Sequence, residues 1–451
     1  MTGSATSRSD SRHRTSSKSQ HHPALLAART ERSGLEVPFV WPFQVTIVVT
    51  FLTSFVALPG PPVVRIVPTA FFLGLGLLLT PKDIIGRVRF DPAFVLLVVW
   101  CVTSLGWSID RGQTVQQLFR EFSRVLAVSV AVGVLGYERT RRTLGGLMQV
   151  AVVAAFVWWA AFPGTSSLPL SGDSETGLRV FFGHKNTLAK VALLAVLFFM
   201  SDKRLGRKRV LWVIAAGVLL RFTTATTALL AAVLGAAVFA IFIFSERLDR
   251  RGRTSLRVLT LFAGLMLVVA SLASSVGSLI NATGKDTTLT GRTEIWKITL
   301  PFARAEFAQG YGFGAVWEAS TGPGPEINRE VGDFPVVDAH NTYLEQVLQI
   351  GGVGTAIMAA WAASTVWRAS KAMSRRPSDG AWIVSSVAAL VLLGVSDAVF
   401  LGWLSWFALL SSASYQLVDA SGGVAAATTA QLSDRSVSQR HRQQGRVRVS
   451  R

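Results

Sequence analysis

The chain has 451 residues, of which 50% are hydrophobic and 16% charged, and its formal net charge is +19. Apolar runs recur along its whole length, which excludes an ordinary soluble domain and indicates a polytopic membrane protein. The single cysteine, Cys101, lies inside one of these runs, so a disulfide framework and a cysteine-based metal site are excluded.

Both ends of the chain are polar. Residues 1–36 are rich in Ser, Arg and His and predict a disordered, basic, cytoplasmic tail. The first apolar run begins near Phe39 without a small-residue cleavage site, so we expect an uncleaved signal-anchor. Residues 419–451 are rich in Ala and Thr and then in Arg and Gln, which predicts a second disordered basic tail in the cytoplasm. Residues 37–418 are expected to form one membrane domain.

About twelve apolar runs follow one another within this domain, and each is expected to be a transmembrane helix. Several are close to the lower length limit of about 17 residues. The runs lie at roughly 39–58, 63–79, 93–107, 125–137, 144–162, 188–200, 210–220, 228–244, 258–280, 343–367, 382–395 and 399–417. The sequence therefore predicts an all-α membrane protein.

Lysine and arginine are concentrated in every second loop between these runs. The basic loops are 81–90, 138–142, 202–209, 246–257 and 368–376. Basic loops stay in the cytoplasm, so this alternation predicts an even number of spans with both termini inside. The other loops, among them 108–122 and 163–185, are then extracytoplasmic. The longest of them, residues 281–340, joins the ninth and tenth spans, and loops of such length are usually functional.

Further cations lie outside the basic loops, against the expected charge bias. They are Arg111, Arg120, Arg124, Arg179, Lys185, Arg221, Lys285, Arg292, Lys297, Arg304 and Arg329. An isoprenoid pyrophosphate at the outer leaflet is a natural ligand for them, because arginine can donate two hydrogen bonds to phosphate oxygens. The alternative is that some of them extend to the membrane interface or pair with neighbouring acids.

The stretch from Asp338 to Thr355 combines a polar entry with a glycine-rich helix. His340 and Asn341 stand where the longest loop meets an apolar run, a water boundary where an imidazole can transfer a proton. Gly351, Gly352 and Gly354 would let a neighbouring helix approach closely. The alternative is that His340 and Asn341 only cap the helix and that the glycines only pack.

Three other segments carry candidate ligand-binding groups. Residues 177–186 contain Arg179, His184, Lys185 and Asn186 in a loop that can present donors to an anion, or that simply turns back into the membrane. Arg221 precedes a threonine-rich stretch that could line a polar cavity or bond to its own helix.

In the long loop, Arg292 and Trp296 would share one face of a helix, since positions i and i+4 adjoin. This pair suits a sugar pyrophosphate, with packing at the start of a helix as the alternative. The glycine-rich residues 310–314 are interpreted as a turn. Asp338 and Asp397 could orient a histidine or an arginine, or could be surface charges.

These motifs resemble those of the bacterial O-antigen ligase and polysaccharide polymerase superfamily. The resemblance rests on His340 and Asn341, the spacer 342–350 and the following Gly351-Gly352-Val353-Gly354-Thr355. Phe182-Gly183-His184-Lys185-Asn186 and the segment from Thr290 to Trp296 are similar to the exopolysaccharide-polymerase branch. Ala225-Thr226-Thr227 departs from that branch, which usually has a basic residue there, and leaves Arg221 as the nearest cation.

The resemblance implies a GT-C-like fold and a metal-independent, inverting membrane glycosyltransferase without a cofactor. The donor would be a glycan on an undecaprenyl-pyrophosphate-type lipid, and His340 would accept the proton of an acceptor sugar hydroxyl while Arg292 offsets negative charge on the pyrophosphate. The residues expected to bind substrate are Arg221, Arg179, Lys185, His184, Asn186, Trp296, Asn341 and Asp338.

The expected reaction is the polymerisation of cell-surface or exopolysaccharide repeat units at the outer face of the bacterial plasma membrane. Besides the lipid-linked donor and the glycan acceptor, the expected partners are membrane lipids and other polysaccharide-assembly proteins, with no nucleic acid. Two alternatives stay open: transfer of a finished glycan to another acceptor, as in an O-antigen ligase, and transport or flipping of a lipid-linked saccharide.

Overall fold

The computed structural model describes residues 40–55, 66–80, 88–166, 177–274, 288–332, 335–399 and 403–419, and all structural statements concern these residues. The chain divides into two compact units, Met1–Pro38 and Phe39–Arg451, and the described residues belong to the second. The predicted tail at 1–36, nearly all of the tail at 419–451, and Lys285 lie outside the described residues.

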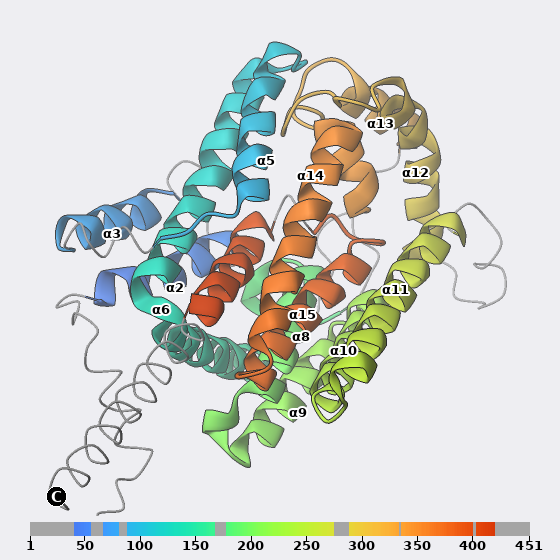
Figure 1. Ribbon diagram of the computed structural model, residues 1–451. Helices are drawn as coiled ribbons and strands as arrows, with labels where there is room; N and C mark the ends of the chain where they lie inside the picture. Colours follow the sequence, from blue (N-terminus) through green and yellow to red (C-terminus); the bar gives the residue numbers. More distant parts are fainter. Residues whose placement is uncertain are drawn as a thin grey trace, which may run out of the picture. The chain divides into compact units, whose positions relative to one another are not determined.

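Within this range the secondary structure is helical (Figure 1). The elements are α2 (Trp41–Phe55), α3 (Val67–Leu78), α5 (Pro92–Thr103), η1 (Ser104–Gly106), α6 (Arg111–Ala161), α7 (Pro163–Ser166), η2 (Val180–Phe182), α8 (Lys185–Ser201), η3 (Lys203–Leu205), α9 (Lys208–Phe222), α10 (Thr226–Ser245), α11 (Arg250–Ser274), α12 (Thr288–Ala305), α13 (Pro323–Val331), α14 (Thr342–Ala372), α15 (Pro377–Leu393) and a last helix at residues 403–419.

Each predicted apolar run coincides with one of these helices or part of one, which confirms the all-α class. Among the described residues, three helices (α6, α10 and α14) are long and apolar enough to cross a membrane. Shorter apolar helices include α2, α3, α5 and α15. The count of twelve spans stays a prediction.

Helix α8 lies in the middle of the bundle, with α9, α10 and α15 packed against it (Figure 1). Ala189, Leu193 and Ala195 are fully buried along it. Gly235 of α10 permits the closest approach, because a Cβ atom there would lie 3.0 Å from Leu197 of α8 and 3.1 Å from Ala389 of α15. This packing fixes the α8 side chains relative to both neighbours.

The structure corrects the boundary of the predicted loop at 108–122. Helix α6 already begins at Arg111, since the Asp110 carboxylate caps it by accepting a hydrogen bond of 3.0 Å from the backbone N–H of Gln113. The helix is interrupted at Gly136, whose φ of 70° and ψ of 171° are non-helical. This break separates the two apolar runs that the sequence predicts as separate spans.

Helix α14 is broken in the same way at Gly351, with φ 69° and ψ 179°. A turn of the long loop, residues 307–312, fills the break. The carbonyls of Leu348 and Gln349, before the break, accept the backbone N–H groups of Tyr311 and Gly312 at 2.9 and 3.0 Å. The Ile350 carbonyl accepts the Trp100 indole N–H at 2.8 Å. After the break, the N–H groups of Gly352 and Val353 donate to the carbonyls of Phe307 and Ala308 at 2.6 and 3.3 Å.

The prediction that a neighbouring helix approaches these glycines is therefore wrong for Gly351. The element that approaches Gly351 is a turn and not a helix, and a Cβ atom on Gly351 would lie 2.2 Å from the Ala308 carbonyl oxygen. The 310–314 segment does form the predicted turn. Because buried backbone groups need partners, the turn that satisfies them ties the long loop to the helix that follows His340.

Four of the predicted basic loops lie together at one end of the bundle. Arg141 pairs with Asp379 at 2.7 Å and donates to Ser201 at 2.8 Å, and Arg376 pairs with Glu138. Arg257 of α11 donates to the Ser370 carbonyl at 3.5 Å. The loops that alternate in sequence thus converge in space, as the positive-inside pattern predicts for loops on one side of a membrane.

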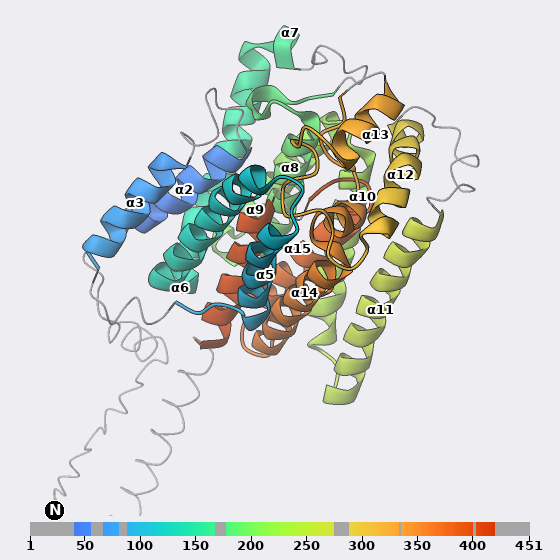
Figure 2. The ribbon, with the colours of Figure 1, turned by 90° about the horizontal axis from the view of Figure 1, so that it is seen from above.

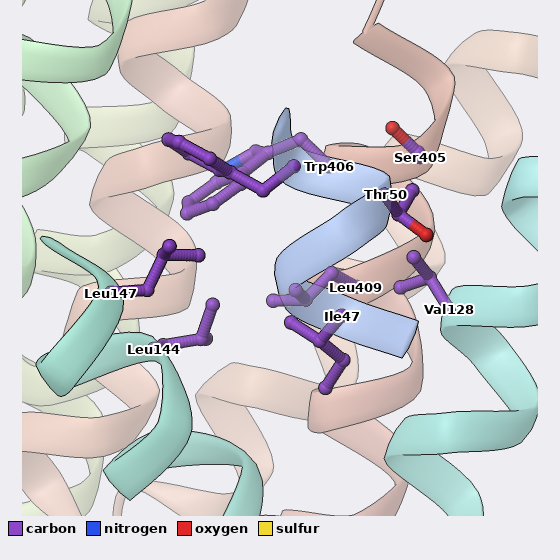
Figure 3. Close-up of a pocket in the computed structure, with 9 residues that line it drawn as sticks. Ile47, Thr50, Val128, Leu144, Leu147, Ser405, Trp406 and Leu409 are labelled. Carbon is purple, nitrogen blue, oxygen red and sulfur yellow. The ribbon is translucent and has the colours of Figure 1, made fainter. Parts of the chain in front are cut away.

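A small pocket lies between α2, α6 and the last helix (Figure 3). Ile47, Val128, Leu144, Leu147 and Leu409 give it a largely apolar lining, which Thr50, Ser405 and Trp406 complete. Its volume of about 20 Å³ is close to the space of one water molecule. It is too small to hold a sugar.

Candidate functional site

His340 and Asp338 form the centre of the candidate site, at the start of α14. The His340 Nδ1 lies 3.2 Å from the Asp338 Oδ1, and the same oxygen accepts the His340 backbone N–H at 2.7 Å. Both side chains are about one-third exposed. His340 has a φ of 46°, a left-handed conformation that is uncommon for a residue with a side chain. Backbone strain of this kind is frequent at functional sites.

Asn341 is occupied by structural hydrogen bonds. Its Oδ1 accepts the backbone N–H groups of Tyr343 and Leu344 at 3.0 Å, which makes it the N-cap of α14. Its Nδ2 donates to the Val395 carbonyl at 3.0 Å, and the residue is 4% exposed. The capping interpretation therefore holds for Asn341, and its bonds hold the end of α14 against the turn after α15.

Glu345, which no sequence motif indicated, holds the His340 loop through a hydrogen bond to its backbone. Its carboxylate accepts the backbone N–H of Ala339 at 2.7 Å and the Trp317 indole N–H at 2.8 Å, together with the Gln349 amide. The side chain is buried. The available signal was an acidic residue inside an apolar run, which usually has a fixed partner or a function.

Helix α12 lies beside the start of α14 in both ribbon views (Figures 1 and 2). Arg292 and Trp296 lie one turn apart on this helix, as predicted, and each reaches a different part of the site. The Arg292 Nη1 donates to the Ser396 carbonyl at 2.8 Å, and the Trp296 indole donates to the Ala339 carbonyl at 2.8 Å. The long loop thus brings an indole to the His340 segment and an arginine to the turn after α15, against which Asn341 holds the start of α14.

Asp397 and Lys190 form a buried ion pair next to this cluster, with 3.0 Å between Nζ and Oδ1. Burial by itself would raise the pKa of Asp397. The charge and hydrogen bond of Lys190 outweigh it, with the charges of Arg292 and His340 acting in the same direction, so the pKa of Asp397 is lowered. The carboxylate is therefore ionised at neutral pH, and it electrostatically couples α8, α12 and the His340 loop.

The second predicted group of residues surrounds the end of α9 and the start of α8. The backbone N–H of Leu178 donates to the Phe222 carbonyl at 2.9 Å. A Cβ atom on Gly177 would lie 2.5 Å from the Thr223 carbonyl oxygen and 3.0 Å from the Lys185 side chain. The 177–186 segment is thus packed onto the residues that follow Arg221, as a folded loop with a local 3-10 turn.

Individual side chains of this group differ in their surroundings. His184 caps α8, because its Nδ1 accepts the backbone N–H of Asn186 at 3.1 Å. Lys185 is 8% exposed, whereas Arg221 is exposed in the last turn of α9. The Arg179 Nη1 is buried and has no hydrogen-bond partner among the described residues. A buried donor of this kind is costly unless a ligand or water occupies it.

The two groups lie at the same end of α8. Lys185 begins the helix, and Lys190, the partner of Asp397, follows five residues later, which corresponds to roughly 7.5 Å along the axis. Val180, Thr224 and His340, the non-glycine residues with positive φ in the described ranges, all belong to this end. The described residues contain no cluster of three or more His, Cys, Asp or Glu that could hold a metal ion.

Helices of membrane-spanning length and a polar site built from a histidine, two acids, an arginine and a lysine define a multi-pass membrane protein with a charged site at one end of its bundle. Residues 210–359 match the O-antigen ligase family. The chain is also 27% identical over 279 residues to the exopolysaccharide production protein ExoQ of Rhizobium meliloti (strain 1021), covering 59% of this chain and 62% of that relative, less than two thirds of its length. The chain is thus similar to the O-antigen ligase family over this region and to an exopolysaccharide production protein over a longer stretch.

Proposed function

We propose that the chain is a membrane glycosyltransferase that moves a glycan from an undecaprenyl-pyrophosphate-type lipid to the hydroxyl of an acceptor sugar. The observation that carries the proposal is the His340–Asp338 pair. Helix α12 contacts the segments around this pair, through Trp296 at Ala339 and through Arg292 at Ser396. The region that matches the O-antigen ligase family, residues 210–359, includes all three residues, and this match supports a role in polysaccharide assembly at a membrane.

In this mechanism, Asp338 holds the Nδ1–H of His340 and so leaves Nε2 to act as the base. Nε2 accepts the proton of the acceptor hydroxyl while the hydroxyl oxygen attacks the anomeric carbon. The bond between that carbon and the pyrophosphate oxygen breaks, the electron pair leaves with the pyrophosphate on its lipid, and the proton stays on His340. A single displacement of this kind inverts the anomeric configuration.

Cationic side chains stabilise the negative charge that develops on the departing pyrophosphate. Arg292 is the first candidate, because it lies closest in the hydrogen-bond network to the His340 loop. Arg179 follows, since its buried Nη1 is a donor without a described acceptor. Lys185 and Arg221 extend the same cationic surface. The Trp296 ring, fixed through its indole N–H, would lie against a sugar ring.

Purified protein in detergent, supplied with a lipid-pyrophosphate-linked glycan, tests the proposal. We expect transfer without a membrane gradient, and we expect His340→Ala to lower the rate by about 10²-fold to 10⁴-fold because the general base is lost. Unfolding curves of both proteins serve as the control for folding. If the protein transferred no glycan in detergent but moved the lipid-linked glycan between leaflets after reconstitution into vesicles, the enzyme would be refuted and a transporter favoured.

The same variant in cells separates polymerase from ligase. Loss of long glycan chains in His340→Ala cells identifies a polymerase, which the exopolysaccharide-related name of the relative favours. Lipid-linked polymer that is made but never reaches its final acceptor identifies a ligase. If chain length and transfer both stay normal, the role of His340 is wrong.

A further inference from the structure

A second polar cavity lies at the end of the bundle opposite His340. Its lining comes from the loop regions after α8 and before α15 and from the part of α6 that follows the Gly136 break. Helix α14, 31 residues long, begins beside His340 and ends beside this cavity, so the two sites are on the order of 40 Å apart. The cavity has a volume of about 260 Å³. It is slightly smaller than the pockets of about 300–1,000 Å³ that hold drug-sized ligands.

The acidic residues of this cavity are all neutralised by cations of the chain itself. Asp379 pairs with Arg141 at 2.7 Å, and Asp202 accepts from the Arg204 guanidinium at 2.8 Å. Glu138 pairs with Arg376. Burial raises the pKa of the Asp202 carboxyl, but the hydrogen bond from the Arg204 side chain and the charges of Arg141 and Arg204 outweigh burial and hold the pKa below its ordinary value. No negative charge of the lining is therefore left over.

Two cations of the lining remain without such a partner. Neither Lys203 nor Arg375 takes part in an ion pair within the described part of the chain, and both are exposed toward the cavity rim. The cavity therefore carries a net charge of about +2 from its own side chains, since five cations and three acids line it. A concave site of one sign of charge attracts ions of the opposite sign.

Ser378 supplies a hydrogen-bonding group at the wall of the cavity. The residue is only 9% exposed, and the described residues provide no hydrogen-bond partner for its hydroxyl. It stands in the first turn of α15, which begins at Pro377 and has 17 residues. In this turn Pro377 has no N–H and the Asp379 carboxylate is paired with Arg141, so the Ser378 hydroxyl and backbone N–H are the groups left to bind an anion.

We propose that this cavity binds a phosphate-bearing anion, with Lys203 and Arg375 as its charged contacts and Ser378 as a hydrogen-bond donor. The chemistry fits a free phosphate or the head group of an anionic phospholipid. The site is separate from the glycan-transfer site and does not depend on the proposed function. An anion here neutralises the excess charge where these three regions of the chain meet and so stabilises the junction of α6, α8 and α15.

The test uses the full-length protein in detergent at low ionic strength, where screening is weak. Two probes are compared: inorganic phosphate against chloride at equal ionic strength, and dioleoyl phosphatidylglycerol against the corresponding phosphatidylcholine in mixed micelles. A ligand that binds the folded state raises the unfolding temperature, and titration of this rise gives the affinity. We expect Lys203→Gln/Arg375→Gln to weaken binding by about tenfold or more, through the loss of two charge-assisted contacts.

Lys208→Gln/Arg209→Gln is the matched control. It removes the same two charges from exposed positions close by that do not line the cavity, so it should leave the affinity unchanged. Ser378→Ala, which alters no charge, should also weaken binding. A response to inorganic phosphate assigns a soluble ligand, and a response to phosphatidylglycerol alone assigns a lipid head group. The proposal is overturned if neither probe stabilises the protein, or if both double variants lose the response equally.

Discussion

Asp338 contacts His340 twice, through the backbone N–H and through the ring nitrogen. We predict that Asp338→Asn, which keeps the shape of the side chain but removes its charge, lowers kcat by about 10²-fold because the imidazole loses the partner that orients it and stabilises its protonated form. The measurement is single-turnover transfer with the purified protein. A positioning role requires the KM for the donor to stay nearly unchanged, and an unaltered kcat would contradict it.

The buried Lys190–Asp397 pair is predicted to behave as a unit. Lys190→Met should lower the free energy of unfolding by about 3–5 kcal/mol, because it leaves an unpaired buried carboxylate, whereas Lys190→Met/Asp397→Leu should recover most of this loss. Denaturant unfolding of the two variants and the wild type checks both values. Equal destabilisation in the single and double variants would show that the ion pair itself is not the origin.

The same pair predicts the direction of a pH effect. The pKa of Asp397 is lower in the folded protein than its ordinary value, so its contribution to stability is fully present above the ordinary pKa and is lost as the pH falls through the lowered one. The wild type should therefore lose more stability on strong acidification than the double variant does. Unfolding curves recorded at neutral and at acidic pH provide the comparison.

Sequence reasoning at the scale of single residues proposed His340, Asp338 and Arg292 as site residues, because each lies in or at the end of the longest loop, where charged groups have no evident structural need. It missed Lys190 and Glu345, which lie inside apolar runs that were interpreted as spans with few interior charges. Asp397, the partner of Lys190, and Trp317, one partner of Glu345, come from other segments of the chain. Only the fold brings these groups together, although a charge within an apolar run was a visible signal.

At the scale of elements, the break in α14 yields a prediction for Gly351. Its φ of 69° suits glycine, and a Cβ atom would collide with the Ala308 carbonyl oxygen at 2.2 Å. Backbone strain alone should lower the free energy of unfolding of Gly351→Ala by about 1–3 kcal/mol, and the steric conflict with Ala308 should lower it further. Thermal unfolding measures the effect.

Gly146 provides the matched control, because it lies in a helical part of α6 with no atom within 4 Å of an added Cβ. Gly146→Ala should leave stability unchanged or raise it by about 0.5–1 kcal/mol. If the two variants were equally stable, the positive φ and the close turn at Gly351 would not matter to the fold.

The positions of helices were predictable because apolar runs of this length have few alternatives to helix in a membrane protein. The breaks at Gly136 and Gly351 were not, since a glycine within an apolar run is also compatible with close helix packing. Whether such a glycine breaks the helix or only packs it depends on a partner that can accept and donate the backbone hydrogen bonds lost at a break. For Gly351 this partner is a turn about 40 residues earlier in the chain, a relation that local sequence does not contain.

At the scale of the whole molecule, the convergence of basic loops predicts which end faces the cytoplasm. Cys101 is 1% exposed, so new cysteines can be probed against a silent background. In intact cells, a membrane-impermeant maleimide should label Val337→Cys, near His340, and should not label Lys203→Cys, at the basic end. Permeabilised cells should show both labels. The reverse pattern in intact cells would place the candidate site in the cytoplasm.

The interlocking of residues 307–312 with the broken helix also constrains the order of biogenesis. A newly inserted α14 cannot complete its backbone hydrogen bonds by itself at Gly351, and unpaired groups are costly away from water. We therefore expect the preceding loop to fold before α14 reaches its final form. The helix that follows the candidate base His340 would mature only after the segment that carries Arg292 is in place, so that a nascent chain has no premature activity.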